Sequence, residues 1–511
     1  MNGAESLVHT LLECGVDTCF ANPGTSEMHF VAALDRIPGM RCVLGLFEGV
    51  VTGCADGYAR MTDRPAATLL HCGPGLANGL ANLHNARRAG VPIVNIVGDQ
   101  ATYHRPLDPP LAADTEGWAR GVSAWVRTAS RAADVGADAA VAVQAAMTAP
   151  GQIATLILPA DAAWDQGGKI AEPLRAPRAP EVASDVLDRI VRVLRRREPA
   201  LLLLGGAALR EAPLEAAHRI AAATGARLMA EGSNARISRG RGRVPVERVP
   251  YPVDLAVRHL SGIRHLILVG ARKPVAFFAY PGKPGYLFPP EADVHVLARP
   301  EEDAASALLG LRDALDAPPA PLPDSPRPEV ARGKPEPEDV ARTVGAVLPE
   351  DAIIVDEAVS FGRGFFAPTH GAAPHEWLQV TGGAIGCGVP LATGAAIGAA
   401  GSRVVALQAD GSAMYTLQGL WTQARENLDV TTVILSNRKY AILLGELANV
   451  GANPGRTALD MLDLDNPGLD WPLLARGMGV EAARAETCEQ LADQLVQSFS
   501  RTGPFLIELL I

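Results

Sequence analysis

VVALQADGS, residues 404–412, places an apolar run directly before Asp410 and Gly411, and VTTVILSNRKY, residues 430–440, places another directly before Asn437. Each run has the length and content of a buried strand, and a helical pattern lies between them. Two strands joined by a helix are typical of a parallel sheet, so this stretch predicts an α/β unit. In such sheets ligands bind outside the carboxyl ends of the strands, where both polar loops begin.

Asp410 and Asn437 end neighbouring predicted strands, so we expect them to converge at one edge of the sheet. A carboxylate and an amide oxygen suit a hard cation, and Mg²⁺ commonly shares such oxygen ligands with the phosphates of a cofactor. The alternative is an ordinary Asp-Gly turn and an unrelated asparagine at a strand end. The occurrence of both motifs at this spacing favours the metal site.

The alternation of apolar runs and helical patterns extends over the whole chain, which predicts an α/β fold with three parallel-sheet domains. We expect a first domain over residues 1–170, a middle domain over 181–316 and a third over 340–511. Residues 317–339 carry eight prolines and are predicted to be a linker, because proline suits neither a helix interior nor a central strand.

Composition excludes several classes of protein. The 511 residues are 48% hydrophobic and 20% charged with a formal net charge of −10, as in a folded globular protein without a basic surface for nucleic acid. No apolar run reaches the roughly 20 residues of a membrane span, and the first residues lack the pattern of a signal peptide. The seven cysteines show no CxxC spacing, so we expect them to be reduced and the protein to be cytoplasmic.

Further polar residues follow predicted strands, and each has a structural alternative. The glycine-rich residues 381–390 predict a backbone that lies close against a ligand. The alternative is tight packing between helix and sheet. Glu48 follows an apolar run and needs a partner if buried, which a helix cap or salt bridge would also supply. For Thr25 the alternative is an N-cap, for His71 a loop imidazole with its own partner, and for Ser360 and Gln100 ordinary loop positions.

Taken together, these motifs resemble those of thiamine diphosphate-dependent enzymes, in particular the acetolactate synthase and benzoylformate decarboxylase family. The stretch from Asp410 to Asn437 looks like the GDG-to-NN motif of that family, with Ala409 and Ser436 departing from it at positions that supply no metal ligand. The resemblance implies thiamine diphosphate and Mg²⁺ as cofactors. It also implies a pyrimidine-binding first domain and a diphosphate-binding third domain.

The resemblance assigns roles residue by residue. The metal would be bound by the side chains of Asp410 and Asn437 and the main-chain carbonyl of Lys439. The implied cofactor contacts are Ser360 at the diphosphate, Gly383 through its carbonyl, Ile385 as the side chain that bends the cofactor, and Gly411, Ser412, Asn437 and Tyr440. The implied catalytic residues are Glu48, which bonds to the pyrimidine N1′, with Thr25, His71 and Gln100 near the substrate.

The implied activity is decarboxylation of a small 2-oxo acid or ligation of its acyl unit, in a homodimer or homotetramer whose active sites lie between chains. The benzoylformate decarboxylase pattern has a second active-site histidine in the middle domain, whereas residues 270–280 contain none and offer Phe277 and Phe278 instead. The alternative is a catalytically idle homologue that binds the cofactor and serves as a partner or regulatory subunit.

Overall fold

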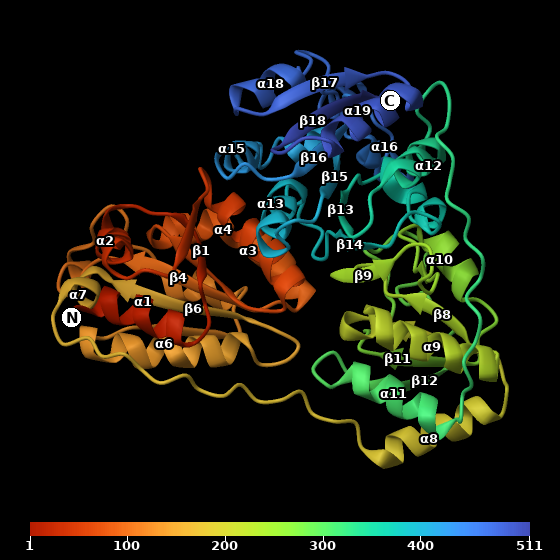
Figure 1. Cartoon of the computed structure of the whole chain (residues 1–511), viewed down its shortest axis with the longest axis horizontal. Helices are drawn as coiled ribbons and strands as arrows, with labels where there is room; N and C mark the ends of the chain where they lie inside the picture. Colours follow the sequence, from red (N-terminus) through yellow and green to blue (C-terminus); the bar gives the residue numbers. More distant parts are fainter.

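The structure, a computed structural model, describes residues 1–511 and contains three β-sheets covered by helices. Figure 1 shows the first domain at the left, the middle domain at the lower right and the third domain at the top. An extended segment runs from the first domain to the middle one, and another climbs from the middle domain to the third. The predicted α/β class with three mainly parallel sheets is confirmed.

The first domain has a six-stranded parallel sheet of order β2-β1-β3-β4-β6-β5. Its strands are β1 (Thr18–Asn22), β2 (Arg41–Leu44), β3 (Ala66–Leu70), β4 (Ile93–Asp99), β5 (Trp125–Thr128) and β6 (Ile153–Pro159). Its helices are α1 (Gly3–Glu13), η1 (Thr25–Glu27), α2 (Met28–Arg36), α3 (Glu48–Thr62), α4 (Cys72–Ala89), η2 (Arg105–Leu107), α5 (Thr115–Arg120), α6 (Ala132–Ala146) and α7 (Ala160–Trp164). Helix α1 begins after Asn2, which forms a reciprocal capping box with Glu5.

The middle domain has a five-stranded parallel sheet of order β10-β8-β7-β11-β12. Its strands are β7 (Ala200–Leu204), β8 (Arg227–Ala230), β10 (Glu247–Arg248), β11 (His265–Val269) and β12 (Asp293–Ala298). Its helices are α8 (Ser184–Arg195), η3 (Gly206–Leu209), α9 (Glu211–Thr224), α10 (Val253–Leu260) and α11 (Ala304–Ala314). Strand β7 is wholly apolar and β11 is apolar after His265, and both are buried, as expected for central parallel strands.

The third domain has a seven-stranded sheet of order β17-β18-β16-β15-β13-β14-β9. Its strands are β9 (Arg236–Arg239), β13 (Ala352–Glu357), β14 (His375–Gln379), β15 (Val404–Ala409), β16 (Val430–Ser436), β17 (Glu481–Ala485) and β18 (Phe505–Leu510). Its helices are α12 (Pro337–Val347), η4 (Phe361–Gly364), η5 (Ala367–Thr369), α13 (Gly388–Gly398), α14 (Asp410–Ala413), α15 (Gln418–Arg425), α16 (Ala441–Asn449), α17 (Arg456–Asp460), α18 (Trp471–Gly477) and α19 (Cys488–Phe499).

Strand β9 lies within the sequence range predicted for the middle domain but joins the edge of the third sheet, where it pairs antiparallel with β14. Its Arg239 is buried and stacks on the Phe366 ring, with the guanidinium carbon 3.4 Å from the ring centroid. Helix α12 begins at Pro337, inside the range predicted as linker, because a proline is tolerated in the first turn of a helix. Residues 317–336 contain no helix or strand.

Helices α3 and α13 pack closely and join the first domain to the third. A Cβ added at Gly57 would lie 2.0 Å from the carbonyl oxygen of Leu391, and one added at Gly394 would lie 1.8 Å from that of Cys54. The two backbones can therefore touch only because both positions are glycine. None of the helices combines the length and apolar character needed to cross a bilayer, and all seven cysteines are free.

Candidate active site

Asp410 and Asn437 lie at the carboxyl edge of the third sheet, as the sequence predicts. Asp410 follows β15 and Asn437 follows β16, and these two strands are parallel neighbours. The loops are linked directly, since the Arg438 N–H donates to Asp410 Oδ2 over 2.6 Å. Arg438 adopts a positive φ of 55°, which turns the chain back toward Asp410. The structure therefore brings together the two side chains expected to bind a metal.

The Asp410 carboxylate is buried without a cationic partner. Its hydrogen bonds come from the backbone N–H groups of Gly411 (2.8 Å) and Arg438, and burial raises its pKa against the effect of these bonds. A buried carboxylate that no positive side chain neutralises is costly. A bound cation would remove that cost.

A cavity of about 60 Å³ adjoins Asp410 and is lined by the predicted cofactor and metal residues of the third domain. The predicted residues on its wall are Ser360, Ile385, Asp410, Gly411, Ser412, Asn437, Lys439 and Tyr440. The polar side chains nearest Asp410 offer oxygen: Asn437 Oδ1 accepts the Lys439 N–H at 3.1 Å, and Ser412 Oγ lies 2.6 Å from Gln408 Nε2. Oxygen donors around a cavity of this size fit Mg²⁺ with a phosphate oxygen.

The glycine-rich loop before α13 is held by Glu357, a residue to which the sequence had assigned no role. Glu357 lies at the end of β13 and accepts the N–H groups of Gly386 (2.8 Å), Cys387 (3.3 Å) and Gly388 (2.7 Å). Burial raises its pKa. The sequence does contain a signal for Glu357, because two carboxylates, Asp356 and Glu357, end the apolar run of β13.

Gly383 and Ile385 of this loop line a larger cavity of about 1520 Å³ between the domains. Gly383 has φ of 80°, and a Cβ there would lie 2.4 Å from the Phe277 ring. Phe277 lies 5.0 Å from Phe278 and 5.5 Å from Tyr251, measured between ring centroids. The apolar wall suggested by the sequence is therefore present at the cavity next to Gly383.

Glu48 is the first residue of α3 and is buried, with 8% of its surface exposed. The sequence placed it at the end of a strand, whereas β2 ends at Leu44 and a short turn intervenes. Its Oε2 accepts a hydrogen bond from Asn78 Nδ2 at 3.0 Å. Glu48 forms this hydrogen bond but no salt bridge, so an ion pair does not explain its burial.

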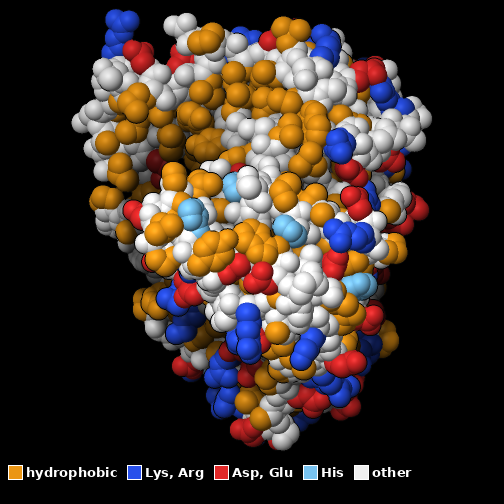
Figure 2. All heavy atoms as spheres, turned by 90° about the vertical axis from the view of Figure 1, so that its left-hand side faces the viewer, with side chains coloured by type: hydrophobic (Ala, Val, Ile, Leu, Met, Phe, Trp, Pro, Cys, Tyr) orange, Lys and Arg blue, Asp and Glu red, His pale blue; other side chains and the backbone are white.

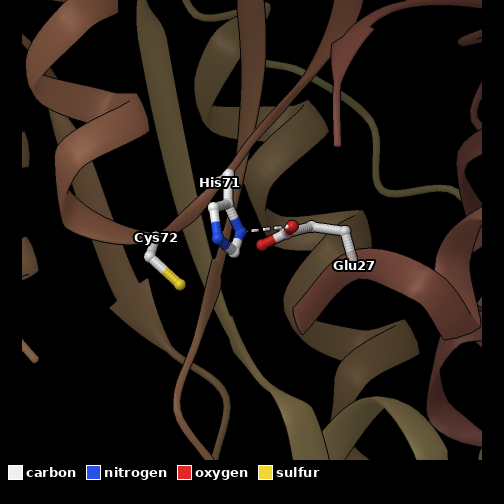
Figure 3. A group of neighbouring side chains, drawn as sticks. All are labelled: Glu27, His71 and Cys72. Atoms are coloured by element: carbon white, nitrogen blue, oxygen red, sulfur yellow. Dashed lines mark hydrogen bonds and ion pairs between the residues drawn. The ribbon is translucent and has the colours of Figure 1, made fainter. Parts of the chain in front are cut away.

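Thr25, His71 and Gln100 follow β1, β3 and β4, so all three lie at the carboxyl edge of the first sheet. Figure 3 shows His71 between Glu27 and Cys72, and His71 Nδ1 lies 2.8 Å from Glu27 Oε2. Glu27 was missed from the sequence, although it stands three residues after Gly24, at the spacing of a capping residue. The imidazole thus has one partner in the chain, through Nδ1.

The predicted residues form two separate groups within one chain. Glu48, Thr25, His71 and Gln100 line neither the 60 Å³ cavity nor the 1520 Å³ cavity, whereas the third-domain residues line one or both. Figure 2 shows that apolar side chains gather in a hollow on the face that includes the first domain. Exposed apolar side chains also lie near Glu48, including Leu46 at 46%.

Comparison with known proteins identifies the fold and the family. Residues 1–118 match the model of the thiamine pyrophosphate enzyme N-terminal TPP binding domain, and residues 366–509 match that of the C-terminal TPP binding domain. The chain is 53% identical over its full length to the protein named "Putative acetolactate synthase large subunit IlvX" of Mycobacterium tuberculosis, covering 99% of it. The chain belongs to the thiamine pyrophosphate enzyme family.

Other thiamine pyrophosphate enzymes match nearly the entire chain. Benzoylformate decarboxylase of Pseudomonas aeruginosa is 30% identical over 97% of this chain and 96% of its own length. The solved 4-hydroxybenzoylformate decarboxylase of Rhodococcus jostii superposes with a TM-score of 0.86 at 25% identity, over 99% of this chain and 98% of that one. These matches confirm the resemblance inferred from the sequence, because thiamine pyrophosphate and thiamine diphosphate are the same compound.

Proposed function

We propose that this protein is a thiamine diphosphate- and Mg²⁺-dependent enzyme that decarboxylates a 2-oxo acid or transfers its acyl unit to a second carbonyl compound. The observation that carries the proposal is the cavity at the edge of the third sheet, where the unneutralised Asp410 faces oxygen donors. Two relatives are named as decarboxylases of benzoylformate and 4-hydroxybenzoylformate, which are 2-oxo acids, and these names support the same substrate class.

The third-domain residues would hold the cofactors. Asp410 and Asn437 would bind Mg²⁺ through their side chains and Lys439 through its carbonyl, with Ser360, Gly411, Ser412 and Tyr440 around the diphosphate. Gly383 would accept a hydrogen bond from the aminopyrimidine and Ile385 would support its bent shape. When bound, thiamine diphosphate supplies an electron sink for the carbanion left by loss of CO₂.

The first-domain residues would move protons. The buried Glu48 would hold a proton shared with the cofactor's pyrimidine, and Asn78 fixes the direction of its carboxylate. Nε2 of His71 would exchange a proton with the substrate, while Thr25 and Gln100 would position it. The aromatic wall at Phe277 would exclude water from the larger cavity.

We further propose that each active site combines two chains. Within one chain the group around Glu48 does not line the cavities that hold the group around Asp410. A second copy of the chain would supply the missing group to each site. The apolar hollow in Figure 2 fits such an interface, because apolar patches on soluble proteins commonly mark protein contacts.

The test is CO₂ release from a panel of 2-oxo acids, with thiamine diphosphate and Mg²⁺ added, for the wild type, Glu48→Gln and the exposed control Glu13→Gln. We expect release by the wild type and the control and its loss in Glu48→Gln. Cofactor binding without release from any 2-oxo acid would support the idle homologue instead. Failure to bind thiamine diphosphate at all would overturn the proposal.

A further inference from the structure

We propose that Glu27 is a positioning residue that fixes the tautomer of His71, keeping the proton on Nδ1 and leaving Nε2 free to exchange protons with the substrate. The inference rests on the proposed function, in which His71 acts at the substrate. Figure 3 shows the Glu27 carboxylate at one side of the imidazole, with the second ring nitrogen turned away from it.

The hydrogen bonds of Glu27 are the observation from which we infer the tautomer of His71. Glu27 Oε2 lies 2.8 Å from His71 Nδ1 and also accepts the Gly24 N–H over 2.7 Å. An ionised carboxylate oxygen can accept both bonds, which requires a proton on Nδ1. With the proton on Nδ1, Nε2 of the neutral imidazole is an acceptor, and it has no partner within the chain.

Burial separates the roles of the two side chains. The Glu27 side chain is 1% exposed, whereas that of His71 is 26% exposed. Burial raises the pKa of Glu27, while the Gly24 N–H and His71 act in the opposite direction. Glu27 therefore cannot reach a substrate itself, and it acts through the imidazole.

Two glycines provide the space for this pair. A Cβ at Gly24 would lie 2.3 Å from His71 Nδ1, and a Cβ at Gly98 would lie 1.6 Å from Glu27 Oε1. Any other residue at either position would force the carboxylate and the ring apart. Oε1 is moreover buried without a hydrogen-bond partner, a cost that fits a functional role better than a stabilising one.

A metal site is the competing explanation, because ligand atoms of Glu27, His71 and Cys72 lie within 4.8 Å of one another. The Cys72 thiol instead lies 3.3 Å from the Ser26 hydroxyl, and burial raises its pKa to about 11. Glu27 Oε2 is also already engaged by the Gly24 N–H and by His71 Nδ1. The cluster therefore fits a pair of Glu27 and His71 with Cys72 as a neighbour.

The test follows the tautomer directly, in holoenzyme labelled with ¹⁵N-histidine. Long-range ¹H–¹⁵N spectra report which ring nitrogen is protonated, and the spectrum of His71→Ala assigns the signals. We expect an Nδ1–H tautomer in the wild type and its loss in Glu27→Ala, or in the longer Glu27→Met if the alanine variant does not fold. Glu27→Gln should retain it, since both hydrogen bonds go to one oxygen, which the amide carbonyl can replace.

Kinetics provides the second readout. Glu27→Ala should lower kcat/KM by about 10- to 100-fold, as loss of supporting partners does at other sites, and Glu27→Gln should recover most of it. In a His71→Ala background, Glu27→Ala should cause no further loss, because Glu27 acts through the imidazole. The exposed Glu13→Gln variant is the control.

Two results would overturn the inference: an unchanged tautomer in Glu27→Ala, or an equal loss of kcat/KM with and without His71. If no 2-oxo acid is turned over, the proposed function fails, and the spectra alone then decide whether Glu27 sets the tautomer.

Discussion

Asp56 and Arg60 form a buried ion pair with two parallel hydrogen bonds, Nε to Oδ1 at 2.8 Å and Nη2 to Oδ2 at 2.7 Å. The third guanidinium nitrogen, Nη1, donates to the carbonyl oxygens of Gln379 at 2.7 Å and Ala235 at 3.0 Å. A single side chain on α3 thus ties the first domain to β14 and to the segment before β9.

Asp56→Ala should strongly destabilise the protein, because it leaves the Arg60 guanidinium buried without its counter-charge. The expected cost is about 3–5 kcal/mol, the usual penalty for breaking a buried ion pair. Thermal unfolding of the holoenzyme measures it as a fall in Tm. The matched control is Asp134→Ala, which removes the partner of the exposed Arg131 and should leave Tm unchanged; equal Tm values for both variants would contradict the prediction.

Mixing two inactive variants tests whether active sites lie between chains. Glu48→Gln and Asp410→Ala should each be inactive alone, yet a mixed dimer would contain one site with both defects and one site with none. After subunit exchange we expect recovery of about a quarter of wild-type CO₂ release, since half of the dimers are mixed and each has one intact site. No recovery, despite exchange verified by mass spectrometry, would place the whole site in one chain.

Asp410→Ala and Asn437→Ala should weaken Mg²⁺ binding in the presence of thiamine diphosphate. Even outer partners of metal ligands commonly contribute 10- to 100-fold in affinity, so loss of a direct ligand should cost at least about tenfold. Titration of Mg²⁺ into chelator-treated protein measures the change by calorimetry. Asp493→Ala, at an exposed aspartate of α19, is the control; unchanged affinity in the Asp410 and Asn437 variants would exclude the proposed ligands.

His375 should contribute a loss of stability on acidification. Burial lowers its pKa to about 3, and Nε2 is buried without a partner, so the folded state keeps this imidazole neutral while the unfolded state protonates near 6.5. Because the unfolded state binds the extra proton, stability falls as pH drops from about 6.5 toward 3, by up to about 1.4 kcal/mol per pH unit.

His375→Asn removes the titrating group and keeps a donor for the Ala373 carbonyl, which His375 Nδ1 contacts at 2.7 Å. The free energy of unfolding, measured by urea denaturation from pH 6.5 downward, should fall less steeply in this variant than in the wild type. Parallel slopes would show that His375 is not protonated on unfolding.

The sequence predicted the main sheets and most of the polar residues at their edges, because buried parallel strands leave a strong apolar pattern and their loops begin at the same edge. Asp410 and Asn437 could be paired for this reason alone. Glu27 and Glu357 could not, since their partners, His71 and the amides of residues 386–388, are brought near only by folding. The pairing of β9 with β14 could not be predicted from the sequence either, because the four residues of β9 mix polar and apolar side chains and give no periodic signal.

The pairing of β9 with β14 also affects the order in which the chain can assemble during translation. β9 leaves the ribosome before the whole linker and before β13, so its partner β14 follows only after more than a hundred further residues. At ordinary rates of synthesis this delay is on the order of ten seconds. During that interval the middle sheet can already form. Arg239 stays uncovered until Phe366 has been synthesised and its ring can pack on the guanidinium.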